Sequence, residues 1–109
     1  MEQRGLLDST LVVAVGEMGR EPQTGKDGKG RGHWPDCYTG LLAGGGVRGG
    51  AIYGASDRIG AYVKDQPVSI EDFAATFFHG LGVPPETRLG ADGFTRPVSE
   101  GRPILEIFG

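Results

Sequence analysis

One apolar segment, residues 10–15 with the sequence TLVVAV, most constrains what this chain can fold into. After Thr10 it carries no polar side chain, which is typical of a parallel strand covered by helices on both faces. The segment runs directly into Gly16 and the carboxylate of Glu17. Because ligand sites of α/β folds lie at the carboxyl ends of strands and in the loops beyond them, we expect a functional site here.

The next stretch, residues 16–32, shows no helical or strand periodicity and is rich in glycine and lysine. We predict a loop, and its 17 residues are long enough for it to be functional or mobile. It ends at His33 and Trp34. A carboxylate and an imidazole at the two ends of a flexible loop suit a divalent metal site or an anion-binding hydrolytic centre, so Glu17 and His33 are the candidate metal ligands. The alternative is structural, with Glu17 capping a loop or paired with Arg20, and His33 packed beside Trp34.

Three further elements follow. Residues 38–43 predict a second strand and residues 51–54 a short edge strand. Residues 69–81 predict a helix, with Ser69 as N-cap and Gly82 as the stop. Its apolar side chains recur at helical spacing and should face the core; they are Ile70, Phe73, Ala74, Phe77, Phe78 and Leu81.

Three strands and one helix make a thin layer, because a closed α/β domain needs helices on the second face of its sheet as well. We therefore predict an α/β fold that is one part of a larger α/β/α sandwich. Residues 1–109 form a single segment and an incomplete domain in this interpretation.

Charge and composition exclude several classes of function. The net charge of −3 argues against a nucleic-acid binder, which would neutralise phosphates with clustered lysine and arginine. No apolar run approaches the roughly 18 residues of a membrane helix, so we expect no membrane span. The single cysteine, Cys37, excludes an internal disulfide.

Four cationic side chains lie in and around the loop, namely Arg20, Lys26, Lys29 and Arg31. Arginine binds phosphate and sulfate better than lysine does, because its planar guanidinium donates two parallel hydrogen bonds. Arg20 is nearest the end of the strand and is the candidate anion-binding residue. The alternative is that all four are solvated loop charges.

The motifs GEMGR, GRGHWPDCYTGLLAGGG, YGASD, PVSIEDFAATFFHGLGV and GRPILEIF span nearly the whole chain. In these motifs the sequence resembles the carboxy-terminal part of the bacterial DUF1501 proteins, which are related to the alkaline phosphatase and sulfatase superfamily. The resemblance implies the carboxy-terminal portion of an alkaline-phosphatase-like sandwich. It also implies a longer parent, often exported to the periplasm or cell envelope, and a nucleophile upstream of Met1.

The same resemblance implies a site. An Asp-His pair at a strand end and a later loop histidine bind metal in the superfamily; Glu17 and His33 occupy the first and last of these positions, and Met18 stands in place of the middle histidine. The implied cofactor is a divalent ion, Zn²⁺, Mg²⁺ or Ca²⁺, and the implied activity of the parent is metal-dependent hydrolysis of a phosphate or sulfate ester. This chain supplies no catalytic nucleophile and is expected to be inactive alone. The alternative is a non-catalytic α/β module for binding or assembly at the cell envelope.

Overall fold

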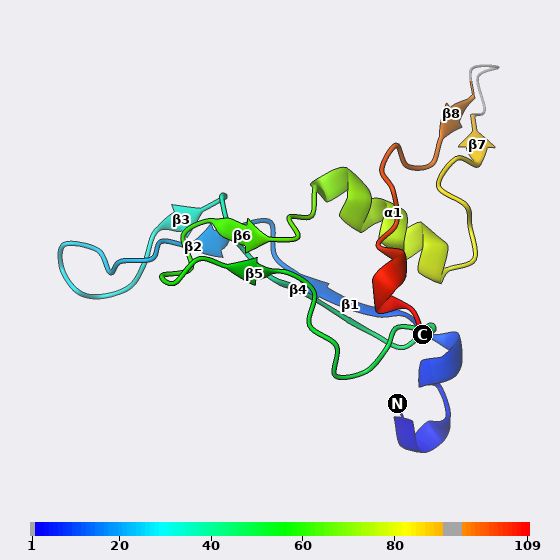
Figure 1. The fold of residues 1–109 in the computed structure, drawn as a ribbon, viewed down its shortest axis with the longest axis horizontal. Coiled ribbons are helices and arrows are strands. Elements are labelled where there is room, and N and C mark those ends of the chain that lie inside the picture. The colour runs from blue at the N-terminus through cyan, green and yellow to red at the C-terminus, as the bar shows by residue number, and fades with distance from the viewer. Residues whose placement is uncertain (1, 91–94) are drawn as a thin grey trace. The chain divides into compact units, whose positions relative to one another are not determined.

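The computed structural model describes residues 2–90 and 95–109 (Figure 1). Contacts divide the chain into two compact units. The first unit consists of Met1–Val12, Leu42–Ala51 and Val68–Gly109, and the second of Val13–Leu41 and Ile52–Pro67. Each unit is built from short elements held by turns.

The first unit is organised around α1, Ile70–Gly80. The helix begins after the predicted N-cap, Ser69, and stops before the predicted stop residue, Gly82. At the start, the Ser69 hydroxyl accepts a hydrogen bond from the Asp72 N–H at 3.1 Å. At the end, Gly82 has a φ of 77°, a value that glycine adopts without strain. This turn lets the Val83 N–H donate to the Phe78 carbonyl at 2.9 Å, which completes the hydrogen-bonding pattern typical of a glycine-terminated helix.

The buried face of α1 differs from the predicted one. Ala75 and Thr76 are fully buried, whereas Ile70 and Leu81 are 73% and 64% exposed. The phenylalanines Phe73, Phe77 and Phe78 are only half-buried. The helix is therefore rotated away from the orientation that its apolar stripe predicted.

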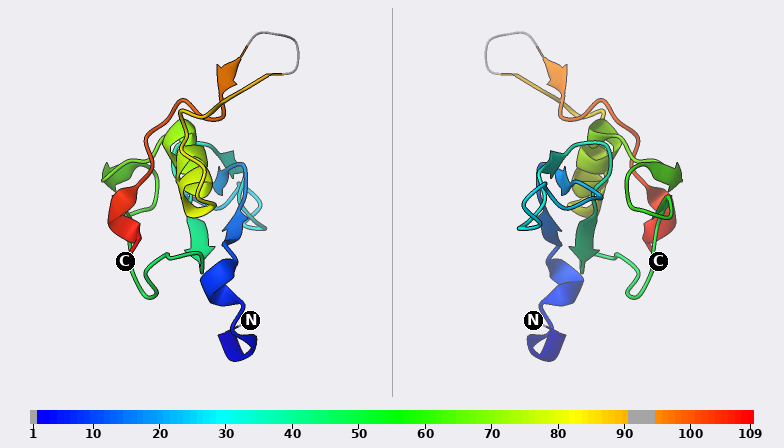
Figure 2. Two further views of the ribbon diagram at one scale, coloured as in Figure 1. Left: turned by 90° about the vertical axis from the view of Figure 1, so that its right-hand side faces the viewer. Right: turned by 90° about the vertical axis from the view of Figure 1, so that its left-hand side faces the viewer.

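The C-terminal segment explains this rotation, since it runs beside α1 (Figures 1 and 2) and is bonded to Thr76 through Ile104. The Thr76 hydroxyl donates to the Asp72 carbonyl at 2.7 Å and accepts from the Ile104 N–H at 3.0 Å. The Arg102 N–H donates to the Asp72 carboxylate at 2.9 Å. Gly101 lies against the main chain of Glu71 so closely that a β-carbon would collide with it.

A short 3₁₀ turn follows, η3, Leu105–Ile107, and both Ile107 and the preceding Ile104 are buried. Phe108 forms an isolated antiparallel bridge with Val47 and packs edge-to-face on the exposed His79, with ring centroids 4.7 Å apart. The glycine-rich run after Ala43 is a tight turn, in which Gly44, Gly45 and Gly46 all have positive φ. The unit also contains η1 (Glu2–Arg4), η2 (Leu7–Ser9) and the antiparallel pair β7 (Arg88–Leu89) and β8 (Arg96–Pro97).

The second unit contains two antiparallel pairs. β2 (Gly19–Arg20) pairs with β3 (His33–Trp34), and β5 (Ala55–Ser56) pairs with β6 (Val63–Asp65). The edge strand predicted at residues 51–54 is wrong in position. Gly54 has a φ of 81° and its N–H donates to the Gln66 side chain at 3.2 Å, so the chain turns there and pairing starts one residue later.

The predicted strands at residues 10–15 and 38–43 form as β1 (Val12–Val15) and β4 (Gly40–Ala43), which pair with each other. The expectation that both faces of β1 are covered is wrong: Val13 and Val15 are 37% and 45% exposed. Within the described residues the structure combines one α-helix with short strand pairs, which is α/β in a loose sense. None of these described helices is both long and apolar enough to cross a membrane.

We predict that Thr76→Val destabilises the chain by about 1–3 kcal/mol. Valine keeps the volume of threonine but leaves the buried Ile104 N–H without an acceptor. Urea unfolding followed by circular dichroism measures the loss. Thr39→Val, the same change at an exposed position, is the control and should leave the midpoint unchanged; equal midpoints for both variants would contradict the role given to this hydroxyl.

Candidate functional site

The long loop predicted at residues 16–32 is in fact a hairpin, β2–loop–β3, and it carries the candidate site. In its register Arg20 lies opposite His33, and Gly19 lies opposite Trp34. The ladder continues one residue further, since the Glu21 N–H donates to the Gly32 carbonyl at 3.1 Å. Because successive strand residues point to opposite faces, Arg20 and His33 share one face, and Glu21 and Trp34 share the other.

Two glycines make the second face possible. A β-carbon on Gly19 would collide with the Cys37 carbonyl and approach the Trp34 carbonyl at 3.1 Å. A β-carbon on Gly32 would lie 2.9 Å from the carboxyl carbon of Glu21. On this face Trp34 therefore lies opposite Gly19, and Glu21 lies opposite Gly32, so each large side chain faces a glycine.

The tip of the hairpin is closed by main-chain hydrogen bonds. The Gly25 N–H donates to the Gly30 carbonyl, and the Gly28 N–H donates to the Gly25 carbonyl, both at 2.8 Å. The Asp27 carboxylate accepts from the Lys29 N–H at 3.0 Å. Main-chain bonds hold this hairpin, and its two-residue strands are too short to show side-chain alternation. For this reason the sequence indicated only a loop.

Arg31 joins the two arms of the hairpin where the tip begins. Its Nη1 group donates to the main-chain carbonyls of Glu21, at 2.9 Å, and of Pro22. This guanidinium thus holds the main chain of the hairpin, which is a structural role that the sequence did not predict.

The structure brings two of the three predicted site residues together. Arg20 and His33 are both exposed and directly opposed, and side chains in such a pair lie roughly 5 Å apart at their β-carbons. His33 points away from the Trp34 face, so the alternative in which it packs on Trp34 is not observed. Glu17 is exposed in the bend between β1 and β2, next to the half-buried Met18.

Across residues 2–90 and 95–109, no three His, Cys, Asp or Glu side chains gather in a group that could hold a metal ion. Glu17 and His33 therefore have no third acidic, histidine or cysteine partner in this part of the chain. Their donor atoms are of the kinds that bind zinc, but a four-coordinate site needs more of them.

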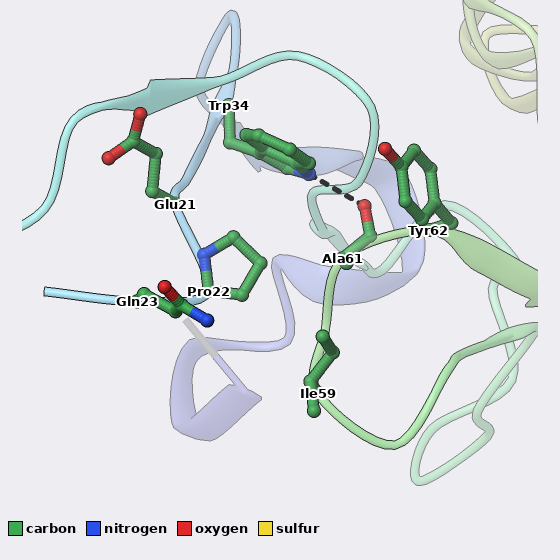
Figure 3. A pocket seen from close by; sticks show the side chains of 7 residues that line it. All are labelled: Glu21, Pro22, Gln23, Trp34, Ile59, Ala61 and Tyr62. Carbon is green, nitrogen blue, oxygen red and sulfur yellow. Dashed lines mark hydrogen bonds between the residues drawn. The ribbon is translucent and has the colours of Figure 1, made fainter.

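The opposite face of the hairpin lines a pocket of about 400 Å³ (Figure 3). Its seven lining residues are Glu21, Pro22, Gln23, Trp34, Ile59, Ala61 and Tyr62. Trp34 lies over the pocket and Tyr62 stands beside it, their ring centroids 5.9 Å apart and their planes inclined at 64°.

Both aromatic residues are positioned by the turn that precedes β6. The Trp34 indole N–H donates to the Ala61 carbonyl at 2.6 Å, and such a bond is common for the polar edge of a packed tryptophan. The Asp57 carboxylate accepts from the Ala61 N–H at 2.8 Å, and the Asp57 N–H donates to the Tyr62 carbonyl at 2.8 Å. The sequence singled out Trp34 but missed Glu21 and Tyr62; the turn-forming pair Asp57 and Gly60 was the available signal for the segment that holds Tyr62.

Fold and site thus define a chain of mixed helix and short strands whose β2–β3 hairpin presents one polar and one aromatic face. Residues 1–108 match the family described as "Protein of unknown function (DUF1501)". The chain belongs to this family, as the sequence motifs indicated. No curated protein and no solved structure matches it.

We predict that Gly19→Ala disrupts the hairpin and costs about 1–3 kcal/mol, because the added methyl group overpacks against main-chain atoms. The single tryptophan, Trp34, reports the change through its fluorescence maximum and the urea midpoint. Gly16→Ala is the matched control, since its β-carbon would make only an ordinary 3.6 Å contact. A normal hairpin signal from Gly19→Ala would show that the close approach is not required.

Proposed function

We propose that this chain supplies part of an oxyanion-binding site in a phosphate- or sulfate-ester hydrolase of the alkaline phosphatase and sulfatase type. The opposition of Arg20 and His33 across the β2–β3 pair carries the proposal. Both side chains can donate hydrogen bonds, and the guanidinium fork matches two oxygens of a tetrahedral anion. Their exposure leaves them accessible to a ligand.

The complete active site requires groups beyond this chain in this proposal. A nucleophile and further metal ligands would come from an upstream part of a longer parent, of which residues 1–109 form the carboxy-terminal portion of the sandwich. Arg20 and His33 lie directly opposite each other and both are exposed, so one bound phosphate or sulfate group could accept hydrogen bonds from both side chains.

We predict that sulfate and inorganic phosphate shift the imidazole proton resonances of His33 saturably, at constant ionic strength. The chain has two histidines, so His79 in α1 serves as an internal reference. Arg20→Gln should weaken the apparent affinity about two- to fivefold, as expected for an exposed charged contact. Lys29→Gln is the control, because it removes the same charge at an exposed position of the hairpin tip.

Equal shifts of His33 and His79 would identify general screening by the salt and would contradict a site at Arg20 and His33. An unchanged affinity in Arg20→Gln would remove this arginine from the site.

We further propose that Glu17 and His33 contribute ligands to a divalent cation in the longer protein. Carboxylate oxygen and imidazole nitrogen both suit zinc, which when bound would polarise an ester oxygen and stabilise developing negative charge. The proposal places Met18 at the position of a lost third ligand, since a thioether binds such ions poorly.

The prediction that tests this is Met18→His. If position 18 faces the same ion as Glu17 and His33, the new imidazole should raise zinc affinity, and Glu17→Gln or His33→Ala in the same background should remove the gain. If Met18 instead fills an apolar contact, histidine should destabilise the chain by about 1–3 kcal/mol with or without zinc. Zinc titration monitored by thermal unfolding separates the two results.

One observation favours the second candidate, a non-catalytic binding or assembly module. Met18 is half-buried while its neighbours Gly16 and Glu17 are exposed. This pattern suits a packing role for the thioether better than a vacated ligand position. Metal-independent destabilisation of Met18→His would therefore make the binding module the preferred function.

A further inference from the structure

The pocket on the aromatic face of the hairpin has a composition that points to a particular class of ligand. Trp34 and Tyr62 form two adjoining walls inclined at 64°, and Pro22, Ile59 and Ala61 complete an apolar lining (Figure 3). Glu21 and Gln23 are the polar members. The seven lining residues together carry one negative charge and no positive charge.

The hydrogen bonding of Trp34 leaves the faces of its ring as the part of the indole that can contact a ligand. The Trp34 indole N–H is already donated to the Ala61 carbonyl, so the indole offers no further hydrogen bond. This bond and the turn at Asp57 fix the ring in place before a ligand arrives. A fixed indole face attracts cations through its quadrupole, and tryptophan does so more strongly than tyrosine or phenylalanine.

The charge of Glu21 adds to this preference. Its carboxylate packs over Gly32, on the same face of the hairpin as Trp34. The adjacent guanidinium of Arg31 donates to main-chain carbonyls, those of Glu21 and Pro22. A ligand with a cationic head would meet two aromatic walls and a carboxylate at the rim.

We propose that this pocket binds a small organic ammonium ion. A volume of about 400 Å³ accommodates a methylated ammonium group with a short substituent, and the apolar walls favour a weakly hydrated cation over a metal ion. The site is separate from the proposed oxyanion site, because Arg20 and His33 lie on the other face of the hairpin. Each site can therefore fail in experiment without the other.

The test uses the whole chain and choline chloride as the probe, with Trp34 fluorescence as the signal and sodium chloride added to hold chloride and ionic strength constant. Choline should change the emission saturably. Its neutral analogue, in which carbon replaces the quaternary nitrogen, has the same shape and should bind at least about twofold more weakly, the lower limit for an exposed cation–aromatic contact. Equal binding of the two compounds, or no saturable change with choline, would overturn the proposal.

Two variants separate the contributions of charge and ring. Glu21→Gln should weaken choline binding about two- to fivefold and leave the neutral analogue unaffected. Tyr62→Leu retains an apolar wall and should reduce the preference for choline over the analogue. Glu100→Gln, an exposed carboxylate in the other unit, controls for net charge and should change neither affinity. A loss of choline binding in Glu100→Gln as large as in Glu21→Gln would show that the effect is not local and would contradict the proposed site.

Discussion

The two-residue alternation of the β2–β3 pair is the constraint on which the site depends. One register, with Arg20 opposite His33 and Gly19 opposite Trp34, assigns every side chain of the hairpin to a polar or an aromatic face. Slipping this register by one residue would exchange the two faces. The close approaches at Gly19 and Gly32 hold the register, because any larger residue there would meet main-chain or carboxyl atoms.

In the other unit, the buried hydroxyl of Thr76 fixes how the C-terminal segment packs on α1. It donates a hydrogen bond to the Asp72 carbonyl within α1 and accepts one from the Ile104 N–H of that segment. With few large side chains fully buried, directional bonds of this kind decide which side of the helix faces inward. Ile70 and Leu81 remain exposed because the C-terminal segment is bonded to Thr76 and Asp72 and therefore packs on another side of the helix.

Glycine content connects these observations. The chain contains 21 glycines, and those at positions 44, 54 and 82 adopt positive φ at turns that end an element or start one. Other glycines, at positions 19 and 101, serve a different purpose and allow two main-chain segments to approach closely. A sequence of this kind specifies its structure through main-chain geometry at least as much as through an apolar core.

The elements with strong local signals were predictable. The helix and both its caps follow from Ser69, Gly82 and the periodicity between them, and the strand at β1 follows from its β-branched run. The hairpin formed by β2 and β3 was not predictable from the sequence. Its two-residue strands show no measurable periodicity, and their pairing depends on main-chain bonds at the tip of the hairpin. Arg20 and His33 were identified from their chemistry, but their opposition across the pair was not.

By itself, the sequence determined the family, the helix with its boundaries and the two longer strands, and it supplied the candidate residues for an anion or metal site. Only the tertiary structure decided which face of α1 is buried, where the edge pairing near Gly54 begins, and that Glu21 and Tyr62 join Trp34 around one pocket. The physical reason is the range of the interactions. Caps and periodicity act within a few residues, whereas the indole bond from Trp34 to Ala61 and the hydroxyl bond from Thr76 to Ile104 join segments 27 and 28 residues apart.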